Sequence, residues 1–178
     1  MLMSWFTQNK LTLFELALFP MYGALMYASK ILMEVFPNVH LIAMFTVLLT
    51  VVYRKKALIP VLVFVFLTGL FSGFSLWWVP YLYLWPLLWA AALLIPQNIS
   101  KKAAFFLYPS LCALHGFLYG SLYAPFQALS FGLTLPQMFA WIVAGLPWDV
   151  LHGISNFALG FLVLPLSKVI QRVEGLRS

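Results

Sequence analysis

Long apolar runs with almost no charged residues fill this chain, and they restrict it to folds that a membrane accepts. Of its 178 residues, 64% are apolar and 8% are charged, against roughly 45–50% and 25% in soluble domains. Ten basic and four acidic side chains cannot cover the surface of a soluble domain of this size. The composition therefore excludes a soluble globular protein, a disordered chain and, despite the net charge of +6, a nucleic-acid-binding protein. It predicts a small polytopic membrane protein.

The breaks between the apolar runs predict an all-α fold. At ~20 residues for each membrane-spanning helix, a single domain, 1–178, holds about six spans. The segment 125–144, punctuated by Gly132 and Pro136, is expected to be a partly helical loop on the outer surface. Pro147 then suits the first turn of the last helix and places Asp149 near the positive end of its dipole. The predicted helices cover about 11–36, 40–53, 57–75, 79–95, 102–124 and 145–166.

The basic residues predict how the chain is oriented. With six spans and both termini inside, every basic residue except Lys30 falls on the cytoplasmic side, as the positive-inside rule requires. We therefore expect a multi-pass protein of the cell membrane, N-in and C-in. The basic residues are Lys10, Lys30, Arg54, Lys55, Lys56, Lys101, Lys102, Lys168, Arg172 and Arg177.

Polar residues inside the predicted spans are the candidates for function, because a polar group in a bilayer is costly unless it is paired. Asp149, His152 and Asn156 have the spacing i, i+3, i+7 and therefore share one helical face. They fit either the lining of a ligand cavity or a hydrogen-bond network that holds two helices together through His115.

Other candidates converge on the same outer half of the predicted bundle. Trp78 fits either an interfacial anchor or a ligand-stacking residue, Trp85 either core or site, and Asn38 and His40 either site or ordinary loop. Lys30 and Glu34, at i, i+4, either neutralise each other or form a charged rim. Polar groups in an aromatic cavity are typical of small-molecule sites. The further candidates for substrate binding are Trp148, His115, Tyr119, Trp85, Tyr81, Trp78, Asn38 and His40.

Several motifs of other protein classes are missing from the sequence. There is one cysteine, Cys112, no Cys/His cluster with zinc spacing and no phosphate-binding glycine loop. The paired-glutamate motif of intramembrane proteases is also missing. We expect no metal, no cofactor and no enzymatic activity. Two alternatives to substrate capture stay open, namely a small transporter that works without ATPases and a membrane assembly subunit without a small-molecule ligand.

The chain resembles the substrate-binding S components of energy-coupling factor (ECF) vitamin transporters. The resemblance is carried by the A-x-x-x-A of Ala24 and Ala28, the loop 37–40, the stretch 69–83 (GLFSGFSLWWVPYLY) and the run 145–156 (GLPWDVLHGISN). It implies high-affinity capture of a vitamin or vitamin precursor within an ABC-type importer. It also implies that Ala24 and Ala28 dock onto a transmembrane coupling subunit, and that two ATPase subunits supply the energy. Lys30, so close to this docking face, departs from the pattern.

The chemistry of the predicted site narrows the expected ligand. Its walls are aromatic, its polar groups are carboxylate and imidazole, and it holds no arginine. Because aromatic faces bind flat rings and favour cations, a neutral or cationic heterocycle fits better than a polyanion.

Overall fold

The computed structural model describes residues 11–175, and within this range every regular element is a helix. The expected all-α fold is thereby confirmed. Two short 3₁₀ turns, η1 (Arg54–Ala57) and η2 (Leu76–Trp78), separate neighbouring helices. The α-helices are α2 (Leu13–Leu32), α3 (Ile42–Tyr53), α4 (Leu58–Ser72), α5 (Tyr81–Leu93), α6 (Lys101–Phe131), α7 (Leu135–Gly160) and α8 (Val163–Val173).

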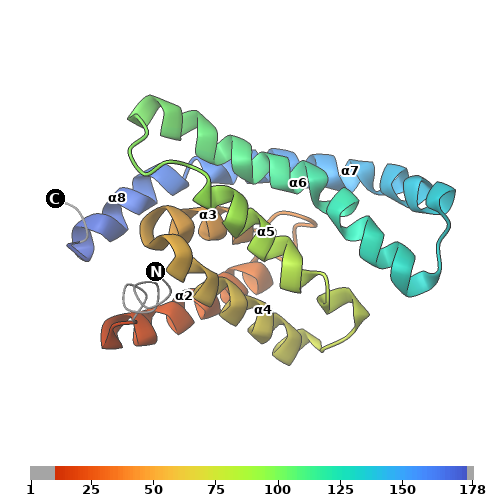
Figure 1. The fold of residues 1–178 in the computed structure, drawn as a ribbon, viewed down its shortest axis with the longest axis horizontal. Coiled ribbons are helices and arrows are strands. Elements are labelled where there is room, and N and C mark those ends of the chain that lie inside the picture. The colour runs from red at the N-terminus through yellow and green to blue at the C-terminus, as the bar shows by residue number, and fades with distance from the viewer. Residues whose placement is uncertain (1–10, 176–178) are drawn as a thin grey trace, which may run out of the picture.

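The helices form two groups that meet along α3 and α5. In Figure 1, α6 and α7 run antiparallel as a long hairpin, and the turn that joins them projects beyond the other helices. Below the hairpin, α2 packs against α4, and α4 contacts α5. The short C-terminal helix α8 packs on α3 and α6 at the opposite end from the hairpin turn.

Glycines allow the two long helices to approach closely. A Cβ atom on Gly116 would lie 2.8 Å from the backbone of Gly153 and His152, and one on Gly160 would lie 2.6 Å from the Cα of Pro109. Such small residues let helix backbones pack directly against each other. They fix which face of α7 turns toward α6, and this face carries the polar residues of α7.

The expected loop 125–144 is wrong, because this segment is helical on both sides of a tight turn. α6 continues through Pro125 to Phe131 and ends at Gly132, whose φ of 65° is the left-handed conformation that glycine adopts without strain. A capping box of Thr134 and Gln137 then starts α7. Pro147 consequently lies inside α7 rather than in its first turn. Asp149 is therefore far from the positive end of the helix dipole.

Four segments of the described chain are long and apolar enough to cross a membrane: 42–72, 76–93, 101–131 and 135–160. The first contains both α3 and α4, which are joined by η1. The first residue of η1 is Arg54, a non-glycine residue with a φ of 54°. α3 and α4 are about 18 Å and 22 Å long at 1.5 Å per residue, so each alone is shorter than the ~30 Å apolar core of a bilayer.

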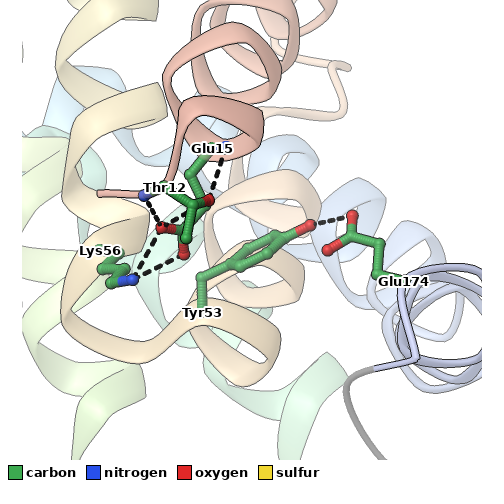
Figure 2. A network of polar contacts seen from close by, with 5 residues as sticks. All are labelled: Thr12, Glu15, Tyr53, Lys56 and Glu174. Carbon is green, nitrogen blue, oxygen red and sulfur yellow. Dashed lines mark hydrogen bonds and ion pairs between the residues drawn. The ribbon is translucent and has the colours of Figure 1, made fainter. Parts of the chain in front are cut away.

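A polar network ties the start of α2 and the end of α8 to the turn after α3. The side chains of Thr12 and Glu15 cap α2, and the Lys56 ammonium binds both oxygens of Glu15 at 2.7 and 2.8 Å. The Tyr53 hydroxyl donates a hydrogen bond to Glu174, just beyond α8. Figure 2 shows these contacts side by side. They hold both ends of the described chain at one end of the bundle.

Candidate functional site

A cavity of about 290 Å³ lies beneath the connection between α2 and α3. It is bounded by the end of α2, this connection, and side chains from α5, α6 and α7. Its residues therefore come from four separate parts of the sequence. The lining residues are Lys30, Met33, Glu34, Phe36, Pro37, Asn38, Val39, His40, Tyr81, Tyr119 and His152.

The connection between α2 and α3 is fixed over the cavity by α7. The Ser155 hydroxyl donates a hydrogen bond to the Asn38 carbonyl at 3.1 Å, and Asn38 itself has a φ of 56°. Asparagine tolerates this conformation better than most residues. Two residues later, the His40 ring lies edge-on to the His152 ring, with 4.8 Å between centroids. The loop thus places one histidine directly against another.

Aromatic rings form the wall of the cavity on the side of α5 and α6. Trp85 is 1% exposed, and its ring centre lies within 6 Å of those of His40, His115 and Tyr119. Tyr119 also contacts His152 at 5.1 Å. These ring contacts bring residues from α5, α6, α7 and the loop before α3 into one group. We call Trp85, His40, His115, Tyr119, His152 and Asn156 the aromatic–imidazole cluster.

Buried polar atoms without hydrogen-bond partners gather in this cluster. Within residues 11–175 there are six such side-chain atoms, and all six belong to the cluster. Because most buried polar atoms in proteins are paired, their collection in one cluster is unusual. Two of the residues that carry them, His40 and His152, line the cavity. The atoms are Nδ1 of His40, Nε1 of Trp85, Nδ1 of His115, Nε2 of His152, and Nδ2 and Oδ1 of Asn156.

These atoms include both hydrogen-bond donors and acceptors. The indole N–H of Trp85 only donates, whereas the Asn156 amide has a donor end and an acceptor end. The Nε2 of His115 lies 3.1 Å from the Leu84 carbonyl, which only accepts. In the neutral ring this contact requires the proton on Nε2, and Nδ1 is then left as an acceptor.

Charge at the cavity is balanced and confined to its rim. Lys30 and Glu34 both line it, so the structure favours the charged-rim interpretation of this pair. Burial lowers the pKa of His40 to about 4, and His115 and Lys30 add smaller effects in the same direction. His40 is therefore a neutral hydrogen-bonding group at pH 7. In the described part of the chain, no three His, Cys, Asp or Glu residues are arranged to hold a metal ion.

Asp149 occupies a different place from the cavity. Its carboxylate accepts hydrogen bonds from the Gly120 backbone N–H at 3.0 and 3.2 Å. Asp149 is not among the residues that line the cavity. The predicted polar face of α7 is therefore divided. Asp149 holds α7 to α6, whereas His152 lines the cavity and Asn156 lies one turn further along the same buried face.

Two predicted tryptophans lie outside the cluster. Trp148 is 55% exposed on the outside of α7. Trp78 donates its indole N–H to the Val65 carbonyl at 2.7 Å and packs against Phe74, which makes it an anchor between η2 and α4. Four of the other predicted residues line the cavity, namely Tyr81, Tyr119, Asn38 and His40. The remaining two, His115 and Trp85, do not line it and contact each other through their rings.

The sequence interpretation missed several apolar residues of the cavity, namely Met33, Phe36 and Val39. Met33 lies between Lys30 and Glu34, and Phe36 and Val39 follow this pair, where α2 gives way to turns. The Pro37–Asn38 step marks this change in the sequence, but apolar residues in a membrane protein carry no further signal of their position. No family model, curated protein or solved structure matches this chain.

Proposed function

We propose that this protein is a membrane-embedded substrate-capture subunit, similar in role to the S components of ECF vitamin transporters. The observation that carries the proposal is a cluster of unpartnered buried polar atoms at an aromatic cavity, among them those of His40 and His152, which line it. An unpartnered buried polar group costs about 1–3 kcal/mol. A ligand that pairs with these groups recovers that cost, whereas a purely structural network would pair them internally.

The size and chemistry of the cavity indicate the ligand class. About 290 Å³ is at the lower end of small-molecule pockets, which span roughly 300–1,000 Å³. Flat aromatic walls and neutral imidazoles suit a small heterocycle that both donates and accepts hydrogen bonds. The balanced rim of Lys30 and Glu34 does not favour a polyanion. The proposed ligand is a vitamin or vitamin precursor with one flat ring.

Membrane topology and partners belong to the same proposal. Six spans with both termini in the cytoplasm place the end of α3, the start of α6 and α8 on the cytoplasmic side. Ala24 and Ala28 are exposed on α2 and offer a close-packing surface to a coupling subunit. Two ATPase subunits would then supply the energy for uptake.

Thermal unfolding of the purified protein in detergent, followed by tryptophan fluorescence, tests the proposal. The screen uses a panel of vitamins and their heterocyclic precursors. A ligand at 100 times its dissociation constant adds about 2.7 kcal/mol to the folded state, which is a clear upward shift. We expect such a shift for at least one monocyclic compound and its loss in His152→Ala.

Trp148→Ala is the matched control for this screen, because the residue lies on the same helix but is exposed to the outside. It should leave the ligand-induced shift unchanged. A shift lost equally in both variants, or no shift across the panel with folded protein, would contradict substrate capture at this cavity. The second result would instead favour an assembly subunit.

A further inference from the structure

A second, smaller cavity lies at the opposite end of the bundle from the aromatic–imidazole cluster. It has a volume of about 120 Å³ and lies between the end of α3, the connection from α5 to α6, and α8. It is lined by Arg54, Lys101 and Lys168, together with the amides of Gln97 and Gln171. Among the described residues that line it, none is acidic. Three cations from distant parts of the sequence therefore face one small space.

Arg54 is held in place at this cavity by the backbone. Its guanidinium donates to the carbonyls of Leu93 and Ile95 at the end of α5. These two bonds use two of its five N–H groups. Its positive φ, unusual for a residue with a side chain, shows that the surrounding structure imposes this position. The carbonyls orient the arginine without neutralising its charge.

Among the described residues, no carboxylate forms an ion pair with any of the three cations. Within residues 11–175 the ion pair is that of Lys56 with Glu15, outside this cavity. The start of α6 adds to the positive potential, because Lys101 is the first residue of a helix of 31 residues. Backbone N–H groups and the helix dipole at such a terminus attract anions. The charge of this cavity therefore favours an anion.

We infer that this cavity binds the phosphodiester headgroup of an anionic membrane lipid. Leu94 lies between the two residues whose carbonyls hold Arg54 and is 83% exposed, and Val169 follows Lys168 in the chain and is 55% exposed. Apolar residues at these places suit acyl chains, and basic pockets between membrane helices on the cytoplasmic side bind lipid headgroups. The inference rests on the proposed membrane embedding and is independent of substrate capture.

Native mass spectrometry of the delipidated protein in detergent tests the inference, with dioleoylphosphatidylglycerol and dioleoylphosphatidylcholine as probes. We expect tighter binding of phosphatidylglycerol, and a loss of about tenfold or more in its affinity for Lys101→Gln/Lys168→Gln. Both lysines are exposed, so their replacement should leave the fold intact. The matched control is Lys102→Gln/Arg172→Gln, which removes the same charge from α6 and α8 outside the cavity. It should bind phosphatidylglycerol within about twofold of the unchanged protein.

The remaining outcomes would overturn the inference. Equal binding of the two lipids, or equal losses in the two double variants, would show nonspecific attraction by net charge. Displacement of phosphatidylglycerol by millimolar inorganic phosphate would assign the pocket to a soluble phosphate instead of a lipid. None of these results affects the thermal-shift screen, because His152 and the aromatic–imidazole cluster are unchanged in every variant.

Discussion

The backbone N–H of Gly120 on α6 points at the carboxylate of Asp149 on α7, 3.0 and 3.2 Å from its two oxygens. A Cβ atom on residue 120 would lie 2.4 Å from Oδ2 of this carboxylate. The contact therefore needs both residues, a carboxylate on one helix and a glycine on the other. It makes Asp149 an interhelical link rather than a residue of the cavity.

We expect Asp149→Leu to lower the unfolding midpoint in detergent, because it leaves the Gly120 N–H without its partner. The cost should be about 1–3 kcal/mol. Asp149→Asn retains an acceptor and should cost less. Trp148→Leu, at the adjacent exposed position, is the control and should change stability little. Equal midpoints for Asp149→Leu and the unchanged protein would show that the contact contributes nothing.

Asn156→Leu should raise the unfolding midpoint of the ligand-free protein. Both polar atoms of this amide are buried without partners, and an apolar side chain of similar size removes a desolvation cost of about 1 kcal/mol or more. The same variant should bind the ligand found in the screen more weakly. Gain of stability with loss of function is typical of residues retained for binding. A lower midpoint would mean that Asn156 is a structural residue.

Stability should fall on acidification in part through His40. Its pKa in the folded protein is about 4, below the ordinary value of 6.5. As the pH falls, the unfolded chain therefore takes up a proton first. The contribution of His40 to the free energy of unfolding is complete above about pH 6.5. It is lost between about pH 6.5 and pH 4, by up to about 1.4 kcal/mol per pH unit.

His40→Gln isolates this contribution, since glutamine stays neutral throughout the range. Unfolding midpoints at pH 7 and pH 5 should differ less in His40→Gln than in the unchanged protein. An identical pH dependence in both proteins would exclude His40 as a source.

Glu174→Ala should loosen α8. The carboxylate accepts hydrogen bonds from Tyr53 and from Tyr22, the latter at 3.4 Å, and it is the polar link between the end of α8 and the core (Figure 2). We expect faster amide hydrogen exchange in residues 163–173. Glu174→Gln, which still accepts a hydrogen bond, should show a smaller effect. Unchanged hydrogen exchange in Glu174→Ala would mean that apolar contacts, such as those of Val163, hold α8 in place.

Local sequence signals predicted most helix positions, but the prediction of a loop at 125–144 was wrong. Proline and glycine at 125, 132 and 136 suggested a loop, yet Pro125 and Pro136 are accommodated within helices. The decisive signals were Gly132 as a helix end and Thr134-x-x-Gln137 as a capping box. A single proline removes one hydrogen bond from a helix of 31 residues, whereas the packing of α6 on α7 stabilises it along its length.

The sequence by itself determined the helical class, the apolar segments and the single polar face of α7, because each follows from composition and from the period of the helix. The tertiary structure decided how that face is used. Close packing at Gly116 and Gly120 sets the register of α6 against α7, and this register pairs Asp149 with a backbone amide while His152 lines the cavity. The approach of His40 to His152 depends on a loop fixed by Ser155. Spacing along one helix cannot predict contacts between helices, since these depend on which side chains fit across the interface.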